Sequence, residues 1–353
     1  MKQGVTAAEL RARSAPILGD GFPAALHQNH WMGETAIDFV TRHRDAPWFL
    51  SLHPYDPHHP LDPAPEFHRR YDKATLPHAR FAPHELAYQK KYEQVDQQRP
   101  IPISPTGECD HPGGPNDHPF IREHPVYEAP LPYDSRKIKA AYYAKIEHVD
   151  HELGRVLDVL EETGQFQDTI VIYHSDHGEH LGDHGLLYKG CRFYESLVHI
   201  PLIFAWPGHL AAGARCADLV ELVDIVPTLM DLMGWSFGEE IQGRSLVPQL
   251  MGTDAKAPKR HVVSFFHDSL DMWDRTHATM SFDGRYKLVT YHNHVDLTEL
   301  FDLGNDPDEF HNIWNDIPAA EQAALLRNHL DALMRTVWPG EPRLTHADFV
   351  IER

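Results

Sequence analysis

The chain predicts a layered α/β fold, and three apolar runs and two amphipathic patterns are the observations that predict it. The apolar runs at 48–52, 169–173 and 201–205 are too short for helices and suit buried strands. Helical patterns over 34–43 and 138–160 precede the first two runs. Helices alternating with buried strands are typical of an α/β sheet covered by helices.

The second of these helices has the clearest pattern in the chain. We expect Ser135 to cap its first turn and Gly164 to end it. Its apolar positions are three or four residues apart: Ile138, Tyr142, Ile146, Val149, Leu153, Val156 and Leu160. A further apolar helix is predicted over 222–233.

Two regions depart from this pattern. Residues 53–134 are rich in Pro and His and show little periodicity apart from a polar helix near 84–97. A loop of that length in a compact domain is usually functional or mobile. We therefore predict one large α/β domain over 1–255 that includes this loop.

A smaller C-terminal subdomain is predicted over 256–353. Strand patterns at 261–266, 276–282 and 286–291, the last two joined by Asp283-Gly284, predict an antiparallel sheet. A helix over 319–337 follows.

Composition narrows the classes of partner. The 353 residues include 32 Lys and Arg against 52 Asp and Glu, a formal charge of −20. No basic face is expected for nucleic acid or an anionic membrane. An anionic substrate would need concentrated local positive charge from a metal ion, Lys or protonated His.

The cysteines and the apolar segments of the chain both bear on the cellular compartment of the protein. Cys109, Cys191 and Cys216 are odd in number and lack CxxC spacing, so we expect reduced thiols and neither a disulfide framework nor a structural zinc site. There is no apolar signal segment or run of membrane-spanning length. The sequence as given predicts a cytoplasmic protein without a membrane partner.

The segment 174–189, HSDHGEHLGDHGLLYK, carries the strongest chemical pattern. Asp176 and His177 follow a predicted buried strand, and α/β sheets bind ligands at the carboxyl ends of their strands. Both side chains can bind a divalent cation, and Lys189 adds a point charge suited to an oxyanion. By composition alone, a solvated His- and Gly-rich loop is the alternative. A zincin site is excluded because HEXXH and HXXEH are absent.

A second group of polar residues follows the predicted strand 48–52. His53, His58 and His59 lie in a loop restricted by Pro54, Pro57 and Pro60. Such a loop would present an imidazole rigidly as a general acid or an oxyanion donor. A structural turn whose histidines bond to backbone is the alternative.

Several blocks, in order along the chain, resemble the sulfatase family of the alkaline phosphatase superfamily. They are PWFLSLHPYDPHHPL at 47–61, AAYYAKIEHVDHELGRVLDVLEETGQFQDTIVIYHSDHGEHLGDHGLLYKG at 140–190 and YESLVHIPLIFAWPG at 194–208, with weaker ones at 242–250 and 285–314. The resemblance implies an alkaline-phosphatase-like layered α/β sheet. It also implies hydrolysis of sulfate monoesters of small molecules or carbohydrates with one divalent metal ion, Ca²⁺ foremost and Mn²⁺ or Mg²⁺ as alternatives.

The resemblance implies roles for individual residues. Asp176 and His177 would be metal ligands, and Lys189 would bind the sulfate group. His58 would contact the sulfate or assist the leaving group, and His184 would line the substrate site. The His beside the ligand Asp also occurs in relatives that resemble phosphonate monoester and phosphodiester hydrolases, so the ester type stays open.

One family feature has no counterpart. Members carry an N-terminal block with paired Asp metal ligands and a Cys-x-Pro/Ala-x-Arg motif that yields a formylglycine nucleophile, whereas Cys109, Cys191 and Cys216 lead CDHPG, CRFYE and CADLV. We therefore expect an N-terminally truncated fold. A non-catalytic binding module is a further alternative, as is homo-oligomerisation through an exposed sheet edge.

Overall fold

A computed structural model describes residues 21–92, 95, 105–106, 134–236, 241–253, 259–267, 276–292 and 294–337. The chain divides into two compact units. Unit 1 contains residues 1–90, 100–170 and 181–188, and unit 2 contains residues 91–99, 171–180 and 189–353. The predicted domain boundary at residue 255 falls within unit 2 and stays a prediction.

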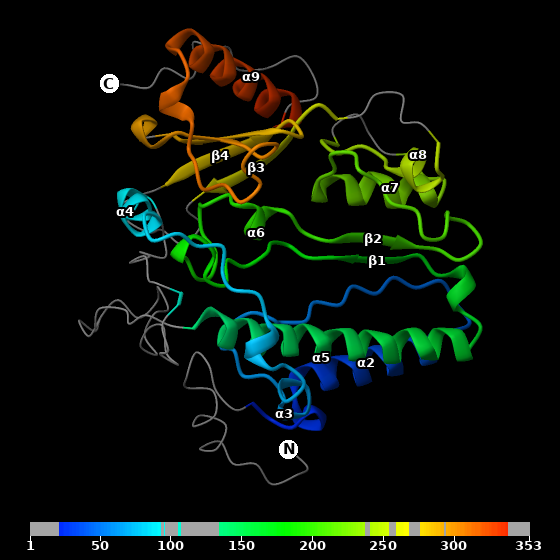
Figure 1. Cartoon of the computed structure of the whole chain (residues 1–353). Helices are drawn as coiled ribbons and strands as arrows, with labels where there is room; N and C mark the ends of the chain where they lie inside the picture. The colour runs from blue at the N-terminus through cyan, green and yellow to red at the C-terminus, as the bar shows by residue number, and fades with distance from the viewer. Residues whose placement is uncertain are drawn as a thin grey trace. The chain divides into compact units, whose positions relative to one another are not determined.

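Two helices dominate unit 1 and lie side by side (Figure 1): α2 (Gln28–Arg42) and α5 (Ser135–Glu162). They approach closely because Gly33 has no side chain; a Cβ there would lie 2.2 Å from Glu152 Oε2. The helix α2 begins earlier than predicted, since His27 Nδ1 accepts the Asn29 N–H at 3.3 Å and caps the first turn.

The ends of α5 correct one prediction and confirm another. The cap is Asp134 rather than Ser135, because the Asp134 carboxylate accepts the Arg136 N–H at 3.1 Å and also binds the Arg136 guanidinium. Ser135 is the first helical residue. Helix α5 ends just before Gly164, which has a positive φ of 74°.

Short elements complete the described part of unit 1. The segment α3 (Pro65–His68) packs on α5. Helix α4 (Glu85–Gln89) and a 3-10 turn over Lys90–Tyr92 occupy the first part of the predicted helix near 84–97, and most of its remaining residues lie outside the described ones. Apolar side chains join these elements to α5 in two small clusters: Leu61, Ile138, Ala141 and Leu181, and Ala64, Phe67 and Ala144.

The prediction of a buried strand at 48–52 is wrong. These residues form no strand, and Phe49 is 77% exposed. The apolar run is present, but a strand requires a hydrogen-bonded neighbour, and no described segment pairs with it. Trp48 instead donates its indole N–H to Gln165 Oε1 at 3.1 Å.

Unit 2 contains the other two predicted strands, β1 (Val171–His174) and β2 (Leu202–Ala205). Their positions are confirmed, but they pair antiparallel with each other, from Val171 opposite Ala205 to His174 opposite Leu202. The expectation that both faces are covered is wrong, since Ile203 is 55% exposed. Around them lie α6 (Glu195–Val198), α7 (Ile225–Leu232) and α8 (Val247–Leu250).

The C-terminal antiparallel sheet is confirmed and has one strand more than predicted. Its order is β3 (Val262–His267), β4 (His277–Phe282), β5 (Tyr286–Tyr291) and β6 (Glu299–Asp302). The predicted helix, α9 (Ala319–Val337), packs against β3 and β4 (Figure 1). Among the described residues, no helix has the length and apolarity needed to cross a membrane.

Candidate active-site segments

The loop that follows β1 presents Asp176 and His177. Strand β1 ends at His174, and the Asp176 side chain is 83% exposed. Asp176 Oδ1 accepts the His177 N–H at 2.9 Å, and Ser175 Oγ donates to His177 O at 2.7 Å. These bonds hold the turn while leaving the second carboxylate oxygen, Oδ2, accessible.

The imidazole of His177 is held in one tautomer. Its Nδ1 lies 2.7 Å from Gly178 O, and a carbonyl only accepts, so Nδ1 carries the proton. In the neutral ring, Nε2 then has the lone pair and lies 3.7 Å from Asp176 Oδ2. A histidine metal ligand is oriented by the same kind of second hydrogen bond.

A close backbone approach fixes the next two residues. Gly178 N donates to Leu197 O at 2.7 Å, and Glu179 N donates to Ser196 O at 3.0 Å. A Cβ at Gly178 would lie 2.0 Å from Ser196 O, so only glycine fits against this segment. The ligand loop is thus attached to α6.

Buried charged groups of unit 2 in turn hold the α6 segment. Arg192 donates to Glu299 Oε1 at 2.7 Å, and Tyr291 Oη donates to Glu299 Oε2 at 2.9 Å. Lys287 bridges Glu195 and Glu309 at 2.6 and 2.7 Å. The C-terminal sheet therefore supports the loop that carries Asp176 and His177.

Lys189 lies within electrostatic range of both Glu179 and Asp176. Burial lowers the pKa of Lys189, while the carboxylates of Glu179 and Asp176 raise it. Burial also raises the pKa of Glu179 to about 8, against the opposing effect of Lys189. Sequence reasoning missed Glu179, although its place between His177 and His180 in the Gly-rich segment was a usable signal.

His58 lies in a tightly folded loop of unit 1. Its Nδ1 is 2.7 Å from His59 O, so it donates and leaves Nε2 as the lone-pair nitrogen of the neutral ring. The His58 ring stacks on His59 at 4.1 Å and contacts Tyr55 at 4.7 Å between centroids. Tyr55 Oη donates to His59 O at 3.1 Å.

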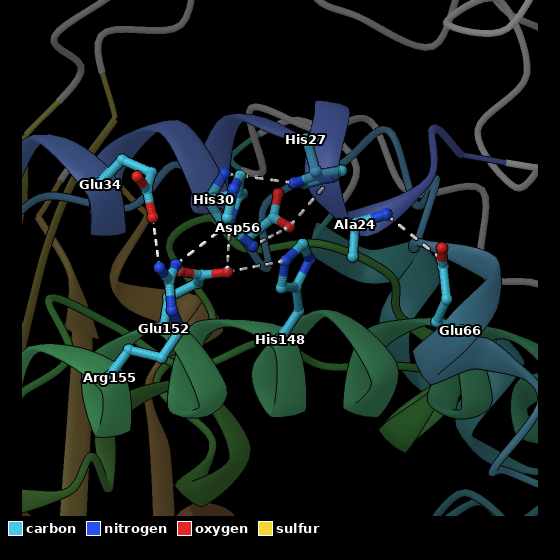
Figure 2. A network of polar contacts seen from close by, with 10 residues as sticks. Ala24, His27, His30, Glu34, Asp56, Glu66, His148, Glu152 and Arg155 are labelled. Atoms are coloured by element: carbon cyan, nitrogen blue, oxygen red, sulfur yellow. Dashed lines mark hydrogen bonds and ion pairs between the residues drawn. The ribbon is translucent and has the colours of Figure 1, made fainter. Parts of the chain in front are cut away.

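Asp56 connects this loop to the helices of unit 1 (Figure 2). Its fully buried carboxylate accepts from Gln28 Nε2 at 3.1 Å and Asn29 Nδ2 at 2.9 Å. His27 Nε2 lies 3.7 Å from the same carboxylate. Figure 2 shows the neighbouring His148 and Glu152 of α5 reaching toward this group.

His184 is buried in unit 1. Its ring Nδ1 lies 2.5 Å from Glu85 Oε1, and the backbone N–H of His184 donates to Arg80 O at 2.7 Å. These contacts attach His184 to α4 and to the segment that precedes it. The role of His184 in lining a substrate site stays a prediction.

The predicted site residues are divided between the units. Asp176, His177 and Lys189 belong to unit 2, whereas His58 and His184 belong to unit 1. A role for His58 beside the other three stays a prediction. Within the described chain, no three His, Cys, Asp or Glu side chains are arranged to bind a metal ion. Asp176 and His177 offer one oxygen and one nitrogen donor, which fit part of a coordination shell.

Two of the three cysteines lie in the described part of the chain. Cys191 is buried, and its Sγ donates to Val95 O at 3.2 Å. Cys216 is exposed. Cys109 lies outside the described residues.

Comparison with known proteins shows the family. A model described as "Sulfatase" matches residues 28–235, more than half of the chain, and one described as "N-sulphoglucosamine sulphohydrolase, C-terminal" matches residues 182–336. The chain belongs to the sulfatase family, within the alkaline phosphatase superfamily.

Individual relatives agree with this assignment. An arylsulfatase of Clostridium perfringens is 28% identical over 88% of this chain and 58% of its own length. An N-acetylglucosamine-6-O-sulfatase of Bacteroides thetaiotaomicron is 30% identical over 57% of this chain and 36% of its own length. The structure of a phosphonate monoester hydrolase from Silicibacter pomeroyi aligns with a TM-score of 0.74 and 27% identity. That alignment covers 89% of this chain and 61% of that one, so the chain spans less than two thirds of each of these relatives.

Proposed function

We propose that this chain contributes metal-binding and anion-binding groups to a hydrolase of sulfate monoesters. Asp176 and His177 would bind one divalent cation, with Ca²⁺ preferred over Mn²⁺ and Mg²⁺. Lys189 would bind the anionic group of the ester. By the family resemblance, His58 would contact that group or protonate the leaving oxygen.

The observation that carries the proposal is the pairing of Asp176 Oδ2 with His177 Nε2. The two atoms lie 3.7 Å apart, and the hydrogen bond from Nδ1 to Gly178 O leaves Nε2 available as a ligand. The Asp176 carboxylate holds the turn through Oδ1, and its side chain is 83% exposed. Lys189 lies within electrostatic range of Asp176 and adds positive charge to a chain of net charge −20.

A bound cation would withdraw charge from the non-bridging oxygens of the ester. Lys189 would add a second positive charge there, and its partly buried position strengthens that interaction. The formylglycine nucleophile usual in the family has no Cys-x-Pro/Ala-x-Arg motif here. The nucleophile is therefore the component that the proposal does not assign to this chain.

Phosphonate monoester hydrolysis is the second candidate. It is favoured by His177 directly after Asp176 and by the 27%-identical phosphonate monoester hydrolase structure. The sulfate ester is preferred because the matched family model and the two bacterial relatives named above are sulfatases. The carbohydrate sulfatase among them makes a sulfated sugar a reasonable substrate class.

Metal binding gives the first test. Calorimetric titration of the chain with Ca²⁺, Mn²⁺ and Mg²⁺ should show one site, and Asp176→Asn or His177→Gln should each weaken it by about tenfold or more. The control is Asp296→Asn, which alters another exposed Asp of unit 2. Equal affinities in all four proteins would refute the assignment of Asp176 and His177.

A further inference from the structure

We infer that Lys145 of α5 is a positioning residue for the loop that presents His58. The inference rests on the proposed function in one respect, namely that His58 acts on the ester. The contacts that carry it lie entirely within unit 1.

The ammonium of Lys145 is surrounded by acceptors from one loop. Its side chain is 1% exposed, and Nζ donates to His58 O at 2.8 Å and Pro60 O at 2.7 Å. The carboxylates of Asp56 and Asp62 lie 3.0 and 3.2 Å from the same nitrogen. One buried cation thus contacts four residues within a stretch of seven.

The composition of the loop explains why it needs such a donor. Pro54, Pro57 and Pro60 have no backbone N–H, so the loop has few donors of its own for its carbonyl groups. The Lys145 ammonium supplies donors for two of those carbonyls. A planar Arg would direct its donors differently and could not occupy the same point among the four acceptors.

A second set of contacts attaches the loop to helix α2. Asp56, bound by Lys145, also accepts from Gln28 and Asn29 of α2. The loop is therefore held by both long helices of unit 1 (Figure 2 shows Asp56 between them).

The consequence for His58 follows from its backbone. Lys145 fixes the carbonyl of His58 itself and that of Pro60, which flank the His59 carbonyl that accepts from His58 Nδ1. Loss of the ammonium should release this turn, weaken the Nδ1–H bond and let the ring adopt the other tautomer. Lys145 would act on the reaction only through this orientation.

The α5 helix offers a matched control in Lys139. Its side chain is also buried, but its ammonium donates to His78 O at 3.1 Å and lies 3.6 Å from Asp183. Lys145→Met and Lys139→Met therefore remove equivalent groups from one helix, and only the first contacts the 56–62 loop. A merely structural role would predict the same behaviour for both.

The test is ¹⁵N NMR of the His58 ring in the full chain, with the signal assigned through His58→Gln. We expect a Nδ1-protonated ring in the wild type and in Lys139→Met, and loss or shift of that signal in Lys145→Met. A wild-type His58 signal in folded Lys145→Met would refute the inference, as would equal shifts in both variants. If Lys145→Met does not fold, Lys145→Arg keeps the charge, and an unchanged His58 signal there would refute it equally.

This readout is independent of turnover. If the calorimetric titration shows no cation site at Asp176 and His177 but the His58 signals respond as expected, Lys145 positions the loop and the proposed function is at fault. If His58→Gln binds an aryl sulfate as tightly as the wild type does, the role of His58 fails while the positioning by Lys145 stands.

Discussion

The rings of two histidines, one in each unit, are oriented by the same kind of hydrogen bond. His58 and His177 each donate Nδ1–H to the carbonyl of the following residue, at 2.7 Å in both cases. In the neutral ring, this bond fixes the tautomer and places the lone pair on Nε2. The sequence located both residues through their positions after apolar runs. It could not reveal the tautomer, because that depends on the side-chain rotamer and the turn.

A glycine sets the position of the second of these histidines. We predict that Gly178→Ala destabilises the protein by about 1–3 kcal/mol, because the added methyl would meet Ser196 O at 2.0 Å and the backbone must move. The movement should also weaken metal binding at His177. Urea unfolding and calorimetric titration measure the two effects.

The control is Gly154→Ala in α5. A Cβ at Gly154 meets nothing within 4 Å, so this substitution should stabilise by about 0.5–1 kcal/mol through helix propensity. The same sign of effect at both positions would contradict the argument from the close approach.

Among the secondary-structure elements, local sequence patterns predicted the helices and the strands that pair with a neighbour close in sequence. Helices α2, α5 and α9 and strands β3 to β5 were predicted from periodicity and the Asp-Gly turn. Strand β6 was missed because its buried Glu299 and Asp302 interrupt the apolar pattern. Their partners, Arg192 and Arg285, are distant in sequence, so no local signal marks the buried Arg192–Glu299 pair or the Arg285–Asp302 pair.

The same limit applies to Lys145 and to the run at 48–52. A Lys in an amphipathic helix normally faces solvent, and nothing near Lys145 in sequence indicates the loop that surrounds it. The apolar run at 48–52 has the composition of a strand, but a strand forms only where another segment lies beside it and accepts and donates its backbone hydrogen bonds.

The contact between α2 and α5 should make stability depend on pH. Burial lowers the pKa of His148 from 6.5 to about 4, reinforced by His27 and opposed by the carboxylates of Glu152 and Asp56. The unfolded chain therefore binds this proton first as the pH falls. Stability should decrease from pH 6.5 to about 4, by up to about 3 kcal/mol from this group.

His148→Leu tests this dependence. Leucine keeps an apolar contact with Phe67, whose ring stacks on His148 at 4.5 Å, and it cannot be protonated. Urea unfolding of both proteins between pH 4 and 7 should give a shallower pH dependence for the variant. His329, whose pKa burial also lowers to about 4, contributes equally to both. Parallel curves would exclude His148 as a source of the effect.

At the scale of the whole molecule, the candidate site depends on support from distant segments. The Asp176 loop is attached to α6, and α6 is held by Lys287 of the C-terminal sheet and by Glu309, which lie 92 and 114 residues from Glu195 in sequence. The C-terminal family model, which matches residues 182–336, covers Lys189 together with the sheet whose charged residues hold α6.

The groups assigned to this chain bind and orient, and they do not include a nucleophile. We predict that the chain alone binds a divalent cation through Asp176 and His177 but turns over an aryl sulfate at a negligible rate. The reason is that none of its three cysteines begins the Cys-x-Pro/Ala-x-Arg motif, and Cys191 is buried against Val95. The measurement is release of the aryl alcohol in the presence of saturating Ca²⁺ or Mn²⁺, with Asp176→Asn as the control. Enzyme-like turnover that is abolished by Asp176→Asn would show that this chain holds a nucleophile of another kind, and an aryl phosphonate in parallel would decide which ester the site prefers.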